Sequence, residues 1–179
     1  MNTSRYSEDE VRQAIEQGPI TAEYQADPRA VIQELNRLRA TELASFLQSQ
    51  QHAYMAVSLL APGLKDVFRT QAALAMQHAD VLAERIQQLS GSPVFQPAEI
   101  AHKAAEQHVQ PEQGATLAIM VTENLVVKRR QIAAYTALIR ELGTQDLTTC
   151  HLLVGLLAAT EQQTSELADY LKGSAATRP

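Results

Sequence analysis

Three residues that can bind a metal ion lie on the apolar stripes of long helical patterns: Glu42, His78 and Glu123. Each continues a row of apolar residues with helical spacing, which predicts that it faces the core of the protein. Burying a lone carboxylate is costly unless a partner or a metal ion compensates its charge. Carboxylate and imidazole are also the side chains that ligate iron and zinc.

A fourth helical pattern also carries polar residues on its apolar stripe. Thr160 and Gln163 lie between Leu157 and Leu167. These polar residues lie near the middle of four helices. Together they form a polar layer at positions that are apolar in an ordinary bundle core. Because cofactor and metal sites of helix bundles are built from inward-facing side chains, this layer indicates a metal site.

The composition is that of an all-α protein. The 179 residues suffice for one domain, aromatic residues make up only 4%, and Trp is absent. The net charge of -5 argues against a protein that coats nucleic acid. Cys150 is the single cysteine, so no intrachain disulfide forms. The sequence has no apolar run of about 18 residues and no signal-peptide core, so we expect a soluble, cytoplasmic protein with no membrane partner.

The two ends of the chain are expected to lie outside the main domain. Residues 1–27 are predicted to form an N-terminal extension with a short helix over about 8–17, because Ser7 and Glu10 have the spacing of a capping box. Residues 173–179 are predicted to form a flexible tail.

Residues 28–172 are predicted to form four long helices. Asp27-Pro28 is a strong helix start, and Pro62-Gly63 and Gly143 are breaks between antiparallel neighbours. The 91–111 connection is long enough to cross the whole bundle, since about 20 extended residues span roughly 65 Å. This arrangement of two helical hairpins and one long crossover is the ferritin-like one. The expected helices are 28–60, 64–90, 111–142 and 146–172, with a short helix over 97–108.

Several segments contain motifs that resemble those of a known protein family. The most specific is HADVLAERIQQLSGSP at 78–93, and the supporting ones are GPITAEYQAD at 18–27, ATEL at 40–43 and ENLVVKR at 123–129. These segments resemble the bacterioferritins and the related Dps-like group of the ferritin-like superfamily. The resemblance covers roughly residues 18–172. It implies an all-α, ferritin-like four-helix bundle, iron handling, and assembly into a homo-oligomer such as a dimer or a hollow shell.

The resemblance also implies a di-iron centre of six ligands: a Glu, a Glu-x-x-His, a second Glu and a second Glu-x-x-His from successive helices. Glu42, His78 and Glu123 fall on three of these positions. The other three positions hold Ala75, Thr160 and Gln163. Two ferrous ions bring four positive charges, and two carboxylates supply only two negative ones. The resemblance therefore implies a degenerate ferroxidase centre.

Two interpretations of this core stay open. In the first, a single iron ion binds Glu42, His78 and Glu123, with Glu161 assisting if the last helix is rotated. In the second, which the ligand count favours slightly, the core holds no metal. The two carboxylates then pair with His78 or with Gln163 and Thr160, as a metal-free polar core.

A methionine, two histidines and a basic run are further candidate functional features, each with less support. Met76 occupies the position of the haem-ligating methionine of haem-binding bacterioferritins, although an ordinary core or interface methionine is the favoured interpretation. His52 and His151 are expected at the surface or at an interface. The basic run Lys128-Arg129-Arg130 is interpreted as a solvated face or a subunit contact rather than a nucleic-acid site.

The sequence thus supports two functions. The first is an iron-binding or iron-storage protein with a reduced metal site and weak or absent ferroxidase activity. The second is a non-catalytic ferritin-like structural subunit that binds no metal, alone or coassembled with an active subunit. DNA protection by shell formation has only the short basic run in its favour.

Overall fold

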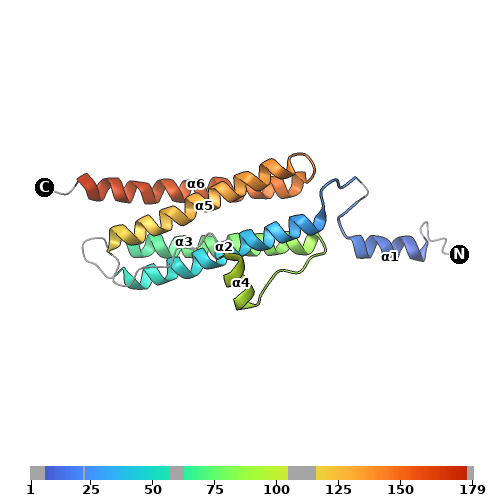
Figure 1. The fold of residues 1–179 in the computed structure, drawn as a ribbon, viewed down its shortest axis with the longest axis horizontal. Coiled ribbons are helices and arrows are strands. Elements are labelled where there is room, and N and C mark those ends of the chain that lie inside the picture. Colours follow the sequence, from blue (N-terminus) through green and yellow to red (C-terminus); the bar gives the residue numbers. More distant parts are fainter. Residues whose placement is uncertain (1–6, 22, 57–62, 105–115, 177–179) are drawn as a thin grey trace.

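The fold of this computed structural model is a bundle of four long helices (Figure 1). The structure describes residues 7–21, 23–56, 63–104 and 116–176, and within these ranges it has six helices and no strand. The helices pack most closely as two hairpins, α2 with α3 and α5 with α6, and contacts of α2 with α5 and of α3 with α6 join the hairpins. The predicted all-α bundle of two hairpins is confirmed.

The first hairpin consists of α2 (Pro28–Met55) and α3 (Leu64–Gln88). Asp27 caps α2 as predicted, because its Oδ1 accepts a hydrogen bond from the backbone N–H of Arg29 at 2.9 Å. Helix α2 ends five residues before the predicted position 60, and residues 57–62 lie outside the described ranges. Helix α3 ends two residues early, because Ser90 adopts a φ of 61°.

The second hairpin consists of α5 (Leu117–Leu142) and α6 (Leu147–Ala176). Thr116 caps α5, and Gly143 ends it with a φ of 49°, a value that favours glycine. The predicted start of α5 at residue 111 falls outside the described residues. Helix α6 continues through Ala176, so the part of the predicted tail before residue 177 is helical.

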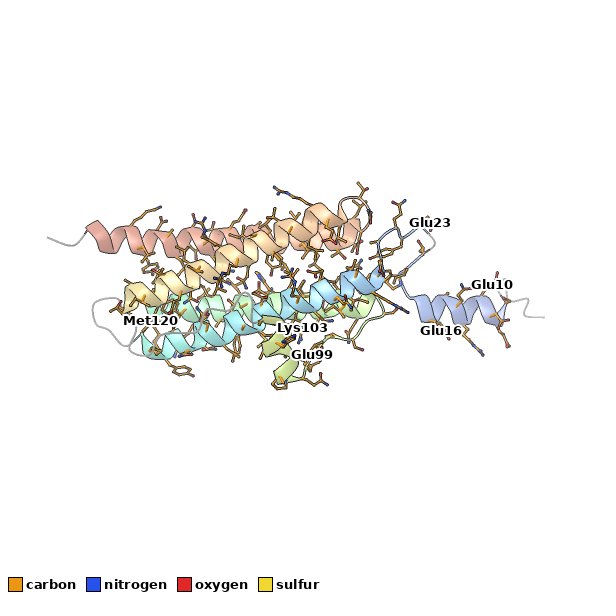
Figure 2. All side chains as sticks on the ribbon, viewed as in Figure 1. Glu10, Glu16, Glu23, Glu99, Lys103 and Met120 are labelled. Carbon is orange, nitrogen blue, oxygen red and sulfur yellow. The ribbon has the colours of Figure 1, made fainter. Side chains whose placement is uncertain are left out.

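Two short helices lie outside the bundle. Helix α1 (Glu8–Gln17) has the predicted capping box, in which Ser7 and Glu10 exchange hydrogen bonds of 2.7 and 3.2 Å. It projects beyond one end of the bundle (Figure 1). Helix α4 (Pro97–Ala104) packs against α2, with Lys103 and Glu99 paired at 3.7 Å on its surface (Figure 2). Its predicted continuation to residue 108 lies outside the described residues.

The crossover is attached to α2 by two buried side chains. Asn36 Oδ1 accepts from the backbone N–H of Val94 at 2.9 Å, and Arg39 Nη1 donates to the carbonyl of Val94 at 2.5 Å. The Arg39 guanidinium also lies 4.5 Å from the centre of the Phe95 ring, a cation–π contact. These contacts hold residues 94 and 95, the part of the crossover just before α4, against α2.

The core has two apolar clusters with polar residues between them. One cluster centres on Leu35, Leu82 and Leu153, and the other on Phe68 and Leu167. The stretch between them contains the polar layer that the sequence predicts. No described helix is long and apolar enough to cross a membrane.

Candidate metal centre

The first polar centre is built around Glu42, whose side chain is completely buried. The Tyr135 hydroxyl of α5 donates a short hydrogen bond to Glu42 Oε1. His78 Nδ1 of α3 lies 3.6 Å from the same oxygen. The predicted neighbours Glu42 and His78 are therefore brought together from the two helices of the first hairpin.

Lys128 of α5 is a second buried charged residue of the bundle, although it forms no ion pair with Glu42 among the described residues. Its side chain is 0% exposed, and no described residue accepts a hydrogen bond from its Nζ. Burial raises the pKa of Glu42, but the charge of Lys128 and the His78 and Tyr135 contacts outweigh burial and hold the pKa below its usual range. Burial lowers the pKa of Lys128, and Glu42 opposes that shift. The centre thus contains a carboxylate that its surroundings keep ionised.

The second polar centre holds Glu123, and its partner is His52. His52 Nε2 lies 3.1 Å from Glu123 Oε2. Asn124 Nδ2 donates to His52 Nδ1, so that Nε2 carries the ring proton. Ser49 Oγ donates to Asn124 Oδ1 at 3.0 Å, which fixes the amide.

The expected position of His52 at the surface or at an interface is wrong. Its ring is completely buried and packs against Phe68, with ring centres 5.4 Å apart. Burial lowers the pKa of His52, while Glu123 opposes the shift. A sequence signal did exist, because Ser45, Ser49 and His52 recur on α2 at spacings of four and three.

The structure does not bring Glu123 to Glu42 and His78. Glu123 pairs with His52, which lies ten residues after Glu42 on α2, or roughly 15 Å along the helix axis. Within the described ranges, no group of three or more His, Cys, Asp or Glu side chains could hold a metal ion. The three predicted ligands are therefore divided between two centres.

Comparison with known proteins gives the family of this fold. A family model described as the ferritin-like domain matches residues 32–175. The chain belongs to the ferritin-like family. No curated protein gives a match to the sequence.

Solved structures share the ferritin-like fold over most of the chain. A dodecameric thioferritin, the bacterioferritin-related protein of Bacteroides fragilis, is 25% identical with a TM-score of 0.79, covering 85% of this chain and 90% of that one. Dps from Thermosynechococcus elongatus is 23% identical with a TM-score of 0.73, covering 80% and 90%. An archaeal Dps homologue from Halobacterium salinarum is 20% identical with a TM-score of 0.77, covering 96% and 93%.

The residues at the centre of this ferritin-like bundle do not fit a di-iron site. Ala75 is buried and has no donor atom, and the Thr160 hydroxyl donates to the carbonyl of Leu156 at 2.8 Å. Gln163 is buried, but a neutral amide does not compensate the charge of two ferrous ions. Glu42 and His78 supply one carboxylate and one imidazole, whereas a di-iron site is rich in carboxylates.

Each long helix of the ferritin-like bundle contributes one buried glutamine: Gln48, Gln71, Gln131 and Gln163. Neither amide atom of any of them has a hydrogen-bond partner among the described residues. Buried amides of this kind ordinarily bind ordered water. The polar layer therefore extends along the bundle instead of being confined to one ligand set.

Sequence reasoning missed the polar face of α5. The basic run of Lys128, Arg129 and Arg130 is interpreted from the sequence as a solvated face or a subunit contact, yet Lys128 is fully buried while the two arginines are exposed. The signal was the spacing of Asn124, Lys128, Gln131 and Tyr135 by four, three and four residues, which places all four on one helix face.

Met76 lies on another face of α3 from His78, because residues two apart in a helix point in different directions. Its side chain is half-buried. The haem hypothesis stays a prediction. His151 is exposed, in line with the surface position expected for it.

Proposed function

We propose that this chain is an oligomer-forming ferritin-like subunit that handles iron as cargo and whose own bundle has weak or absent ferroxidase activity. Membership of the ferritin-like family supports the iron-handling part of this proposal. The likeness to a dodecameric thioferritin supports assembly into a homo-oligomer.

The proposal of reduced ferroxidase activity rests on one observation. Glu123 pairs with His52 and lies away from Glu42 and His78. Oxidation of ferrous iron at a ferritin-like centre needs two ions held by several carboxylates. Glu42 and His78 alone supply one carboxylate and one imidazole, and Tyr135 already donates to that carboxylate. Any iron that the assembly takes up would then be held by surfaces other than the centre of the bundle.

The second candidate is a structural or partner subunit that binds no metal. The hydrogen bond from Tyr135 to Glu42 favours it, because a carboxylate with protein partners needs no metal ion to compensate its burial. Coassembly with an active ferritin-like subunit would give such a chain its function.

The test measures native mass and then the uptake of ferrous iron in air, in the wild-type protein and in Glu42→Gln. We expect a large homo-oligomer that accumulates ferric iron slowly and at the same rate in both proteins. Fast oxidation that Glu42→Gln abolishes would contradict the proposal, because it would place a working centre in the bundle. A well-assembled protein that retains no iron would instead favour the partner subunit.

A further inference from the structure

We propose that a small monovalent anion such as chloride binds in the interior of the bundle, at a site formed by Lys128 and three buried glutamines. The glutamines are Gln48, Gln71 and Gln163. The site lies along the bundle axis between the two carboxylate–histidine centres and uses neither of them. It goes beyond the proposed function, because it involves no iron and does not depend on how the assembled protein handles iron.

Lys128 of α5 and Gln48 of α2 lie at the same position along the bundle axis. Tyr135 of α5 donates to Glu42 of α2, and this contact sets the register of the two helices. A second contact joins the residue ten positions further along α2 to the residue eleven positions further back on α5, so the helices run antiparallel. Gln48 lies six residues after Glu42, and Lys128 lies seven residues before Tyr135. Both are therefore about 10 Å along the axis from the Glu42 centre, on the same side of it.

Gln71 of α3 lies at this position as well. His78 Nδ1 lies 3.6 Å from Glu42 Oε1, which sets the register of α3 against α2. The ring contact of His52 with Phe68 shows that these two helices are also antiparallel. Gln71 lies seven residues before His78, just as Gln48 lies six residues after Glu42. The two glutamines of the first hairpin are therefore neighbours along the axis.

Gln163 of α6 completes the set from the fourth helix. Arg85 Nε of α3 donates to Thr149 Oγ1 of α6 at 2.8 Å, which sets the register of these two helices. Gln71 lies fourteen residues before Arg85, and Gln163 lies fourteen residues after Thr149. Because α6 returns along α5 in the second hairpin, it runs antiparallel to α3. Gln71 and Gln163 therefore lie at the same position along the axis.

The polar atoms of this layer have no partner within the chain. Among the described residues, Lys128 Nζ and both amide atoms of Gln48, Gln71 and Gln163 lack a hydrogen-bond partner. The four side chains are nevertheless at most 3% exposed. Buried polar groups are nearly always hydrogen-bonded in native proteins, so a set of unpaired ones at one position of a core indicates a bound species.

The charge of Lys128 favours an anion over water as this species. Water would complete the hydrogen bonds of the amides, but it would not balance a buried ammonium. The carboxylates of the flanking centres have other partners, because Tyr135 donates to Glu42 and Glu123 Oε2 lies 3.1 Å from His52 Nε2. An anion accepts hydrogen bonds from the ammonium and from the amide NH₂ groups together. A close-packed core leaves room only for a small one.

Bromide, which replaces chloride and scatters anomalously, tests the site directly. Crystals of the full-length protein are soaked in sodium bromide, and anomalous diffraction is measured at the bromine absorption edge. We expect a bromide within hydrogen-bond distance of Lys128 Nζ and of glutamine amides of the layer. Water alone in the layer, with bromide only at the surface of the protein, would overturn the proposal.

Thermal unfolding tests the same site in solution, in sodium chloride and in sodium gluconate of equal ionic strength. An anion that binds only the folded protein raises the Tm as its concentration increases. Each tenfold increase of chloride above its Kd should raise the Tm of wild type by roughly 2–4 °C. Lys128→Met should abolish this response to chloride. The matched control Arg129→Met makes the same change at the next residue, which is exposed, and should keep the response. Equal responses in Lys128→Met and wild type would contradict the proposal.

A second pair of variants decides the case in which Lys128→Met does not fold. Gln71→Leu removes one amide of the layer and leaves the ammonium in place, whereas Gln77→Leu makes the same change at an exposed position of α3. The response of the Tm to chloride should be smaller in Gln71→Leu than in Gln77→Leu. Equal responses of these two variants would overturn the proposal. Iron enters none of these measurements, so their outcome is independent of the proposed iron handling.

Discussion

Glu42 and Glu123 both lie on apolar stripes of their helices, but their side chains have different neighbours. Glu42 is completely enclosed, receives a hydrogen bond from Tyr135 and lies 3.6 Å from His78 Nδ1. Glu123 Oε2 lies 3.1 Å from Nε2 of His52, whose other ring nitrogen accepts a hydrogen bond from Asn124. At the scale of single residues, each carboxylate therefore has its own protein partner that can compensate its burial.

The His52 centre predicts a pH dependence of stability. Burial holds the pKa of His52 below its unfolded value of 6.5, so the unfolded chain binds the proton first as the pH falls. The stability contributed by neutral His52 is thus complete above about pH 6.5 and is lost below it, by up to about 1.4 kcal/mol per pH unit. Urea unfolding between about pH 5 and pH 8 measures this loss.

The matched variant is His52→Gln, which keeps a polar side chain but cannot titrate. Its stability should change less than that of the wild type over the same pH range. An identical slope in both proteins would mean that other groups cause the pH dependence.

At the scale of elements, a buried ion-pair cluster around Asp146 fixes the start of α6 to α3. Asp146 Oδ1 accepts from Arg85 Nη2 at 2.9 Å and from the backbone N–H of Thr149 at 2.9 Å. Tyr24 donates its hydroxyl to Asp146 Oδ2 at 2.8 Å, and burial together with this contact raises the pKa of Tyr24. One carboxylate therefore caps α6 and ties it to α3 and to the segment before α2.

Asp146→Ala should destabilise the protein by about 3–5 kcal/mol, because it removes the cap of α6 and leaves the Arg85 guanidinium buried without its carboxylate. Chemical unfolding monitored by circular dichroism measures the loss. The control is Asp169→Ala, which breaks an exposed pair with Lys172 on the same helix and should cost about 0–1 kcal/mol. Equal losses in the two variants would contradict a structural role for the Asp146 cluster.

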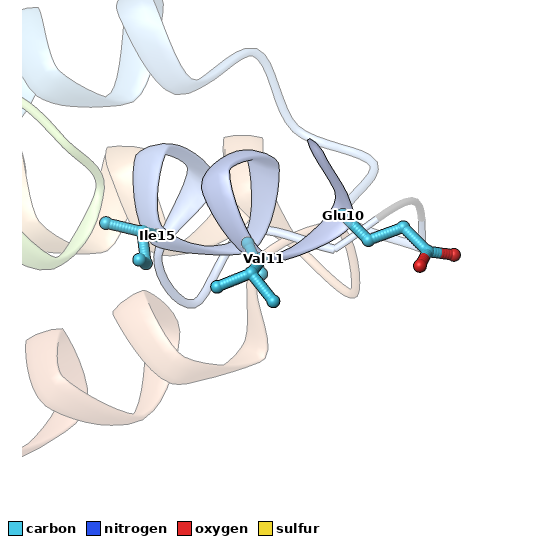
Figure 3. A pocket seen from close by; sticks show the side chains of 4 residues that line it. Glu10, Val11 and Ile15 are labelled. Carbon is cyan, nitrogen blue, oxygen red and sulfur yellow. The ribbon is translucent and has the colours of Figure 1, made fainter. Parts of the chain in front are cut away.

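At the scale of the whole molecule, the bundle and α1 are distinct parts. Helix α1 leaves Val11 and Ile15 exposed, and with Glu10 and Ala14 they line a surface pocket (Figure 3). Within the described ranges α1 does not pack against another helix. Its end is held near the bundle by a hydrogen bond of 3.4 Å from Ser90 Oγ to the carbonyl of Glu16.

Deleting residues 1–17 should therefore change the free energy of unfolding of the bundle by less than about 1 kcal/mol, because no bundle helix in the described ranges loses a packing partner. Urea unfolding of the truncated and full-length proteins, at the same protein concentration, makes the comparison. A loss of several kcal/mol would show that α1 covers part of the bundle in solution.

The helices and their order could be predicted from the sequence, because caps and breaks act locally. Asp27-Pro28, Ser7 with Glu10, and Gly143 begin or end helices where the sequence places them. The meeting of Glu42 and His78 could also be predicted, since the periodic stripes of α2 and α3 in one hairpin face the same core.

The partners of Glu123 and the burial of Lys128 could not be predicted from the sequence. The position of a residue along the bundle axis depends on how far one helix is shifted along its neighbour. Side-chain packing between segments that are distant in sequence determines that shift. The basic run around Lys128 has the composition of a solvated face, yet the rotation of α5 turns its first residue inward and its next two outward. The helices and the polar layer therefore follow from local sequence, whereas the division of that layer into two centres follows from tertiary packing.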